Sequence, residues 1–185
     1  MSEYLDIVDE YGNPTGEIVE RQKAHAEGIR HRTSHVWILR KRQGKVQILL
    51  QKRAEGKDSH PGCYDISSAG HIPAGDDFRV SAVRELQEEL GIQASEEEMI
   101  VCGDRRILWE AEFYGKPFRD HQVSRVFFIW RDLEETDFTI QEEEVESVRW
   151  MDLEDCIQGV QENTIKHCIA IEELKMVQKK IRGLL

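Results

Sequence analysis

The sequence has little of what marks a secreted, disulfide-bonded or membrane-spanning protein. The four cysteines form no CxxC pair and no other metal-ligand spacing: Cys63, Cys102, Cys156 and Cys168. The first ten residues lack the basic and apolar segments of a secretory signal. The longest apolar stretches, such as residues 126–130, are far shorter than the roughly 20 residues that span a bilayer. We therefore expect a cytoplasmic protein without a membrane segment.

Basic residues are fewer than acidic ones, 25 against 36, and this limits the kinds of ligand that the chain is expected to bind. The net charge is -11, the pI is about 5.1, and 33% of the residues are charged. An acidic chain disfavours non-specific binding to nucleic acid, so we expect no nucleic-acid partner. A phosphorylated small molecule remains compatible with this charge, because a bound metal and a few Lys or Arg side chains suffice to bind it.

Nothing in the composition divides the chain. There are four prolines, no Pro/Gly/Ser-rich linker and no internal repeat within the 185 residues. We predict one domain over residues 1–185, with a core at about 30–155 and a C-terminal helix at about 163–182.

The order of apolar patterns predicts an α/β (α+β) architecture. Residues 5–8 and 17–19 flank the turn-forming YGNPTG and predict an N-terminal hairpin. Further strands are predicted at 35–40, 46–51, 64–67, 100–112, 123–130 and 145–150. Helices are predicted after residue 76, at 153–160 and at about 164–181. This order is typical of a mixed sheet with helices on both faces.

The helix after residue 76 carries an unusual set of carboxylates. At about 100° per residue, Glu85, Glu88 and Glu89 fall within an arc of roughly 100° and share one face. The opposite face collects four apolar residues, Val80, Val83, Leu86 and Leu90. We therefore predict an amphipathic helix with an acidic ridge turned outward. Like charges at this spacing repel one another, whereas a bound Mg²⁺ would be stabilised by such oxygen ligands.

Residues 70–92, GHIPAGDDFRVSAVRELQEELGI, extend this pattern over a longer motif. Gly70 is followed after five residues by Asp76, and after seven more by Arg84-Glu85-Leu86. One residue separates these from Glu88-Glu89, and one more from Gly91-Ile92. The segment closely resembles the Nudix box, with Asp76 where the usual form has Glu. The resemblance implies the Nudix fold, an α/β/α sandwich, and hydrolysis of a diphosphate linked to a second moiety X.

The resemblance also implies roles for the box residues. Glu88 and Glu89 would be the primary ligands of Mg²⁺, with Mn²⁺ as the alternative metal. Glu85 would be a further ligand or the base that activates water, and Arg84 would orient Glu85. The backbone at Gly70 would supply another metal-facing carbonyl.

The sequence from Gln51 to His71 resembles a narrower branch of this family, which includes isopentenyl-diphosphate isomerases and related hydrolases. In the isomerases an Arg and a Lys four residues later hold the substrate diphosphate, and Arg53 and Lys57 stand at these positions. Guanidinium binds phosphate oxygens in a bidentate manner and Lys adds a point charge. The resemblance thus implies a small-molecule diphosphate substrate.

Isomerase activity is the alternative, and several residues oppose it. Ala69 precedes Gly70-His71 where isomerases carry a catalytic Cys, and Gln122 replaces an expected Glu. Of the isomerase metal-ligand positions, His31 and His71 match, whereas His25 is one residue out of register. A ligand-binding Nudix protein without turnover is the third hypothesis, since a carboxylate outside the box is not identified.

Several points stay open at this stage. The base or extra ligand outside the box has four candidates, Asp120, His121, Gln122 and Glu144. Aromatic residues of an insertion between strands can either stack on a nucleobase or line an isoprenoid pocket: Trp109, Phe113, Tyr114 and Phe118. The identity of X is not specified, and the sequence leaves a homodimer open.

Overall fold

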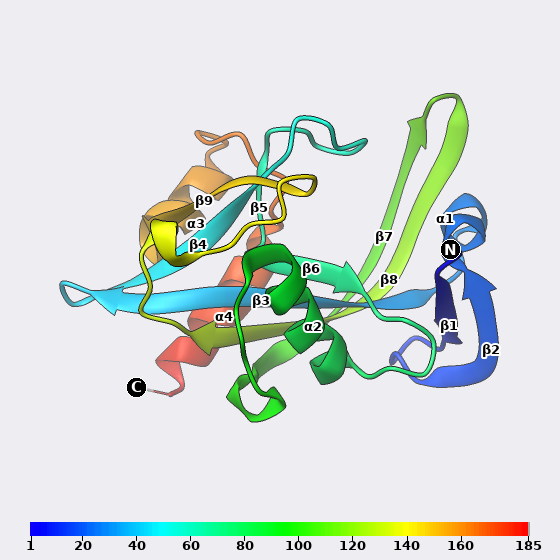
Figure 1. Ribbon diagram of the computed structural model, residues 1–185, viewed down its shortest axis with the longest axis horizontal. Coiled ribbons are helices and arrows are strands. Elements are labelled where there is room, and N and C mark those ends of the chain that lie inside the picture. The colour runs from blue at the N-terminus through cyan, green and yellow to red at the C-terminus, as the bar shows by residue number, and fades with distance from the viewer. Residues whose placement is uncertain (185) are drawn as a thin grey trace.

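Strand β3 (His31–Arg42) organises the main sheet. The computed structural model describes residues 1–184, and β3 runs through the middle of it (Figure 1). β3 pairs antiparallel with β4 (Lys45–Arg53) and β6 (Ser68–His71), and parallel with β8 (Lys116–Trp130). The remaining strands extend this sheet to seven: β5 (Tyr64–Asp65) and β9 (Val145–Asp152) pair with β4, and β7 (Ile100–Phe113) pairs with β8. The sheet is therefore mixed, as predicted.

Helices cover both faces of this sheet. α2 (Phe78–Leu90) packs on one face, and α3 (Leu153–Gln161) and α4 (Ile171–Arg182) pack on the other (Figure 1). The remaining elements are α1 (Arg21–Glu27), the predicted N-terminal hairpin of β1 (Tyr4–Val8) and β2 (Pro14–Glu20), and the 3₁₀ turns η1 (Glu96–Glu98) and η2 (Glu135–Asp137). The α/β/α sandwich with C-terminal helices is confirmed.

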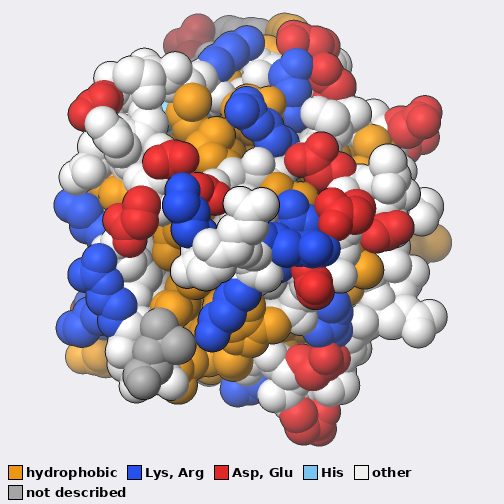
Figure 2. All heavy atoms as spheres, turned by 90° about the vertical axis from the view of Figure 1, so that its left-hand side faces the viewer, with side chains coloured by type: hydrophobic (Ala, Val, Ile, Leu, Met, Phe, Trp, Pro, Cys, Tyr) orange, Lys and Arg blue, Asp and Glu red, His pale blue; other side chains and the backbone are white. Residues whose placement is uncertain are grey.

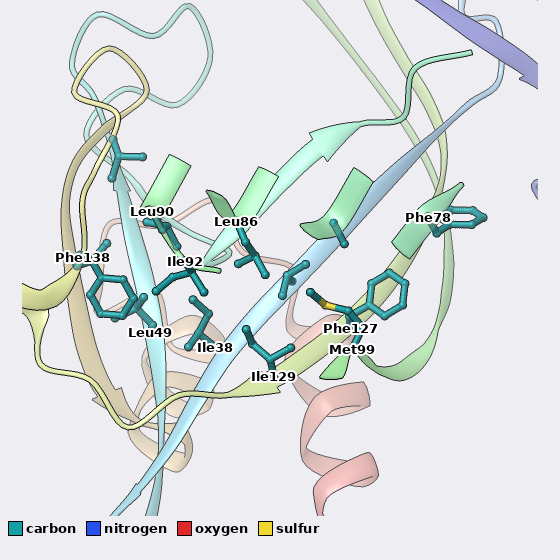
Figure 3. Close-up of a cluster of buried hydrophobic side chains, with 14 of the residues drawn as sticks. Ile38, Leu49, Phe78, Leu86, Leu90, Ile92, Met99, Phe127, Ile129 and Phe138 are labelled. Carbon is teal, nitrogen blue, oxygen red and sulfur yellow. The ribbon is translucent and has the colours of Figure 1, made fainter. Parts of the chain in front are cut away.

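Alternation along the central strands divides the core into two layers. Val36 and Ile38 of β3 face α2, in the layer drawn in Figure 3, whereas Trp37 and Leu39 face α3 and α4. Because both faces are covered, the central strands read as continuous apolar runs, as in other doubly covered sheets. All four of these side chains are essentially inaccessible to solvent.

The strand predicted at 64–67 is wrong in its extent, because the chain changes partner there. β5 pairs with β4 and β6 pairs with β3. Between them, the Ser67 hydroxyl donates to the Leu49 carbonyl (2.6 Å) and accepts from the Ile38 amide (2.9 Å). The Ser67 hydroxyl thus bridges the backbones of β3 and β4 where these strands diverge. The chain then continues into β6, which contacts α2.

The C-terminal helix begins at Ile171, not near residue 164 as the apolar spacing predicts. Residues 166–168 are instead extended along β5. The Tyr64 amide donates to the Lys166 carbonyl (2.9 Å), and the Cys168 amide donates to the Tyr64 carbonyl (3.0 Å). Backbone pairing therefore replaces helical hydrogen bonds over this segment.

The ends of α2 follow from its sequence, whereas its buried face differs in part from the prediction. The Asp77 carboxylate caps the first turn by accepting from the Arg79 and Val80 amides, and Gly91 ends the helix in the left-handed conformation (φ 67°). Val80, predicted to be in the core, is 41% exposed. Phe78, two residues before Val80, is buried in the core instead. The helix begins at Phe78, and its ring packs onto the sheet.

The β7–β8 hairpin extends well beyond the other strands (Figure 1). On the face of the molecule with the β3–β4 turn, acidic and basic side chains are interspersed (Figure 2). Ion pairs such as Lys45–Asp152 and Arg42–Glu134 connect them there. No helix within residues 1–184 combines the length and apolar character needed to cross a bilayer.

Candidate active site

The box glutamates lie along the edge of α2 that faces β4 and β6. Glu89 is only 9% exposed, and the Gln51 amide of β4 donates to its Oε2 (3.0 Å). The Glu85 side chain is partly buried, while that of Glu88 is 56% exposed. The prediction of a fully outward ridge is therefore wrong for Glu89. With Leu86 and Leu90 directed into the core, the flank of the helix with Glu85 and Glu89 contacts the sheet edge.

Gly70 of β6 lies directly against Glu85. A Cβ atom at Gly70 would lie 2.2 Å from Glu85 Cδ and 2.4 Å from Oε1. Any side chain at this position would displace the Glu85 carboxylate. The glycine of the motif is thus required by this close approach of the helix side chain to the strand backbone.

Arg84 connects the carboxylates of the box. Its guanidinium lies 3.0 Å from Glu85 Oε1, 3.2 Å from Asp76 Oδ2 and 3.8 Å from Glu88 Oε1. It also donates to the carbonyl of His71 (3.4 Å). Asp76 reaches Arg84 even though its side chain is shorter than the usual Glu. The position of Arg84 agrees with the predicted orienting role.

The electrostatics of the glutamates suit a cation. Burial, together with the nearby Glu85 carboxylate, raises the pKa of Glu89 to about 8. Burial also raises the pKa of Glu85, against the opposing effect of Arg84. One guanidinium therefore serves several crowded carboxylates, and hard oxygen donors of this kind suit Mg²⁺. The donor set fits the divalent metal that the resemblance implies.

Arg53 ends β4 and Lys57 lies in the loop between β4 and β5, and both have partners. Arg53 donates to the Ser59 carbonyl (3.0 Å) and lies 3.2 Å from Asp65 Oδ2. Lys57 forms an ion pair with Glu144. Glu144 in turn is close enough to contribute to the raised pKa of Glu89. Glu144, one of the four candidates outside the box, thus acts on Glu89 through its charge.

A second cluster of potential metal ligands comes from four elements. One ligand atom from each of four side chains lies within 4.8 Å of the others: His25 of α1, His31 of β3, His71 of β6 and Asp120 of β8. Asp120 Oδ1 lies 3.4 Å from His25 Nε2 and 3.5 Å from His31 Nε2, and His71 Nε2 lies 3.2 Å from His25 Nε2. Three imidazoles and a carboxylate are a common donor set for Zn²⁺, Mn²⁺ or Fe²⁺.

Protonation in this cluster also suits a cation. His31 Nδ1 donates to the Ile29 carbonyl (2.8 Å), and the buried His31 Nε2 has no hydrogen-bond partner. Burial, reinforced by the neighbouring cations, holds the pKa of His71 well below its usual value. Against the effect of burial, the adjacent imidazoles of His25 and His31 hold the pKa of Asp120 well below its usual range. A neutral imidazole, as in His71, and an ionised carboxylate, as in Asp120, are the forms that bind metal.

A buried chain of hydrogen bonds leads from this cluster to the C-terminal helix. The Gln122 amide donates to Asp120, and Gln122 Oε1 accepts from the Thr33 hydroxyl (3.1 Å). Thr33 Oγ1 lies 3.4 Å from His35 Nε2, and His35 Nδ1 lies 3.0 Å from the Glu173 carboxylate. When His35 is protonated, its Nδ1 donates to Glu173, and from its Nε2 onward each donor points toward Asp120. Gln122 therefore holds Asp120 in place instead of adding a charge to the cluster.

The sequence alone does not bring this cluster together. His25 lies on α1, which the sequence does not predict because the helix has only seven residues and no side-chain N-cap. Asp120 is brought near by the parallel pairing of β3 with β8, in which His31 is opposite Gln122. The signal in the sequence is the resemblance of His31 and His71 to metal-ligand positions of the isomerases. His121, another candidate, accepts from Arg30 Nε (3.1 Å) and is not among these ligands.

The predicted aromatic residues lie on the β7–β8 hairpin. Trp109, Phe113 and Phe118 contact one another, and Phe118 stacks on His25 with ring centres 4.5 Å apart. The ring of Tyr114 is exposed, and its hydroxyl donates to Asp58 (2.9 Å). The structure thus places Phe118 beside the histidine cluster, and Trp109 and Phe113 next to Phe118.

Solved structures share the fold at low sequence identity. A Deinococcus radiodurans protein, DR0079, has a TM-score of 0.66 and 15% identity, with 95% of this chain and 98% of that chain covered. The NUDIX domain of Shewanella oneidensis NrtR, solved in complex with ADP ribose, has a TM-score of 0.56 and 14% identity, with 83% and 88% covered.

Relatives in sequence are more similar. Nudix hydrolase 3 of Arabidopsis thaliana is 36% identical over 156 residues, which cover 83% of this chain and 20% of the relative. An uncharacterised Nudix hydrolase of Clostridium acetobutylicum is 36% identical over 143 residues, covering 77% of this chain and 66% of the relative. An isopentenyl-diphosphate Delta-isomerase of Pectobacterium atrosepticum is 33% identical over 122 residues, covering 66% and 63%. The chain thus spans about a fifth and about two thirds of the first two relatives.

The family model of the NUDIX domain matches residues 29–168, which include the sheet from β3 to β9 and the box helix. The chain therefore belongs to the Nudix family.

Proposed function

We propose that the chain is a divalent-metal-dependent hydrolase that cleaves a diphosphate linkage in a nucleoside diphosphate derivative or related organic diphosphate. The observation that carries this proposal is the crowding of Glu85 against Gly70 and of the buried Glu89 carboxylate near Glu85, while Arg84 pairs with Glu85. Such an arrangement is unfavourable by itself and becomes favourable with a bound cation.

Each residue of the box has a separate task in this proposal. Glu88 and Glu89 bind Mg²⁺ or Mn²⁺, and the carbonyl of Gly70 adds a neutral oxygen. When bound, the cation neutralises charge on the phosphoryl oxygens and lowers the pKa of a coordinated water. Glu85 accepts the proton of the attacking water or completes the ligand set, and Arg84 fixes its rotamer.

Arg53 and Lys57 bind the diphosphate. Their present partners, Asp65 and Glu144, neutralise both cations at the protein surface. A diphosphate offers more negative charge than either carboxylate and displaces them at little cost, because these ion pairs are partly exposed. When Lys57 binds the diphosphate, its ion pair with Glu144 breaks, and the Glu144 carboxylate becomes free near Glu89.

The test is a substrate panel with the full chain. Phosphate or phosphomonoester release is measured from nucleoside diphosphates, nucleotide sugars, dinucleotides, coenzyme A and isopentenyl diphosphate. Each reaction is run with Mg²⁺, with Mn²⁺ and with chelator. Turnover of one class that requires metal supports the proposal. Binding without turnover across the panel points instead to a ligand-binding Nudix protein.

Replacing Gly70 with Ala is expected to lower turnover by about 10²-fold, because the added methyl group displaces the Glu85 carboxylate by about 1 Å or more. The measurement is kcat/KM together with a thermal melt. Gly159→Ala is the matched control, since the new Cβ in α3 would meet only ordinary contacts at 3.5 Å. Unchanged kcat/KM in Gly70→Ala would contradict the position assigned to Glu85.

The cluster of His25, His31, His71 and Asp120 favours a second candidate function. It supplies metal ligands of the type that the isomerase branch uses, and one relative bears the isomerase name. Ala69 opposes this function, because no thiol is present immediately before Gly70-His71. Conversion of isopentenyl diphosphate to dimethylallyl diphosphate, measured in the same panel, distinguishes isomerase activity from hydrolysis.

Whatever the reaction, we expect this cluster to bind a transition metal. Titration of metal-free protein with Co²⁺ or Zn²⁺ is expected to give one tight site, with visible Co²⁺ absorption typical of nitrogen ligands. His31→Ala is expected to weaken this site by about 10²-fold, in line with the loss of one ligand. His167→Ala, outside the cluster, serves as the control. Equal affinities in the two variants would rule the cluster out as the site.

A further inference from the structure

The far half of the β7–β8 hairpin has one aromatic face. Along β7 from Arg105 to Phe113, every second side chain is partly buried and those between are exposed. The partly buried set includes Trp109 and Phe113, and Phe118 of β8 joins them. Their ring centres lie 5.3 to 6.1 Å apart. These three residues are called the aromatic wall below.

The aromatic wall does not belong to the protein core. None of its three rings is part of the hydrophobic clusters under α2, under α3 and α4, or under the N-terminal hairpin. The hairpin carries them away from the sandwich (Figure 1). The usual reason for aromatic residues on an inner strand face, packing against a helix layer, therefore does not apply to them.

The aromatic wall borders the candidate active site on two sides. Phe118 stacks on His25 at 4.5 Å and 23°, and Asp120 follows on the same face of β8. Trp109, opposite Asp120 in the β7–β8 register, has its ring centre 5.6 Å from that of His60, in the loop that carries Lys57. The wall thus contacts both a residue of the histidine cluster and the loop with the proposed diphosphate-binding residues.

We propose that the aromatic wall binds the organic group attached to the diphosphate, and that this group presents a flat, uncharged ring. The inference rests on the proposed function insofar as Arg53 and Lys57 bind the phosphate part. Trp109 is then a specificity-determining residue, which contacts substrate without taking part in bond cleavage.

A ring fits the wall better than a branched hydrocarbon does. Stacking needs one accessible aromatic face, and a stacked base typically strengthens binding by about tenfold or more. A hydrocarbon gains only in proportion to the area enclosed around it, and it needs a closed pocket. The three rings are only partly buried and carry no charge, so an anionic group would gain nothing from contact with them.

The test uses ligands that contain no diphosphate linkage, so that binding is measured independently of turnover. AMP, UMP, isopentenyl monophosphate and inorganic phosphate are titrated into the full chain with Mg²⁺ by calorimetry and by tryptophan fluorescence. At least one nucleotide is expected to bind about tenfold tighter than inorganic phosphate. Its binding is expected to change the Trp109 signal, identified as the difference from Trp109→Phe.

Variants locate the effect on the wall. Trp109→Ala is expected to remove the tenfold advantage while leaving the affinity for inorganic phosphate unchanged. Trp109→Phe, which retains a ring, is expected to keep most of the advantage. Leu108→Ala is the matched control, because Leu108 is the neighbour on the outer face and is 66% exposed.

Two outcomes would overturn the inference. One is the absence of a nucleotide advantage, or an advantage equal in Trp109→Ala and wild type. The other is tight binding of isopentenyl monophosphate that depends on Trp109, which would assign the wall to a hydrocarbon. If Trp109-dependent nucleotide binding is found but no diphosphate is hydrolysed, the inference stands and the proposed hydrolase function fails.

Discussion

Replacing Glu89 with Gln is expected to lower metal-dependent turnover by about 10²–10³-fold and, at the same time, to stabilise the metal-free protein at pH 8. The first effect follows from loss of a charged metal ligand. The second follows from burial, which together with the Glu85 charge raises the pKa of Glu89 to about 8. The same side chain is thus expected to favour activity and oppose folding, as strained active sites commonly do.

The pH dependence distinguishes this effect from ordinary repacking. The folded pKa lies above the ordinary value of 4.5, so the folded state binds the extra proton. The ionisation of Glu89 therefore costs no stability below about pH 4.5 and costs progressively more toward pH 8, by up to about 1.4 kcal/mol per pH unit. The difference in melting temperature between Glu89→Gln and wild type, measured with chelator, is expected to grow from pH 5 to pH 8.

Glu88→Gln is the matched control for this experiment. Its carboxylate is more than half exposed, so the substitution removes a proposed metal ligand without removing a buried charge. We expect lower turnover without the stabilisation of the metal-free protein at pH 8. A stability difference in Glu89→Gln that does not change with pH would contradict the account of Glu89 as a buried carboxylate that binds a cation.

The fold could be predicted largely from the sequence because its signals are local. The order of strands and helices predicts a mixed sheet covered on both faces, and the structure has buried side chains on both faces of β3, β4 and β8. Gly91 predicts the end of α2, and the structure places it in the left-handed conformation. Where tertiary pairing replaces the local pattern, as at residues 166–168 along β5, the prediction fails.

The site could be predicted only in part, for a related reason. Spacing along one helix predicts that Glu85, Glu88 and Glu89 lie together, but it does not say which of them is buried, because that depends on the sheet edge beside α2. The cluster that contains His25 and Asp120 depends on strand register and on a short helix. Neither leaves a periodic signal in the sequence.

Glu173 of α4 is the clearest example of such a non-local group, and its replacement is expected to have the largest effect on stability. The side chain is 1% exposed. It accepts from His35 Nδ1 (3.0 Å), Trp37 Nε1 (3.1 Å) and Arg105 Nη1 (2.7 Å). Glu173→Ala leaves the buried His35 and the partly buried Arg105 without their common anion. Removal of one partner from such a network costs about 3–5 kcal/mol, which we expect to see by urea denaturation near pH 6.

The sign of the pH dependence follows from both partners. Although burial opposes it, Glu173 raises the pKa of His35, so this contribution is complete below about pH 6.5 and is lost as the pH rises through the raised value. Against burial, His35 and Arg105 lower the pKa of Glu173, so its contribution is complete above about pH 4.5 and is lost toward lower pH. The stability difference between wild type and Glu173→Ala is therefore expected to be greatest between about pH 4.5 and 6.5.

Glu172→Ala, on the exposed side of the same turn, controls for helix propensity and is expected to change stability by less than about 0.5 kcal/mol. A loss in Glu173→Ala that is equal at pH 5.5 and pH 9 would assign its effect to packing alone. The expected loss at pH 5.5 would instead identify the ion pair as the contact that fixes α4 to β3. Since His35 also leads through Thr33 and Gln122 to Asp120, the same variant is expected to weaken metal binding at the histidine cluster, which Glu172→Ala leaves unchanged.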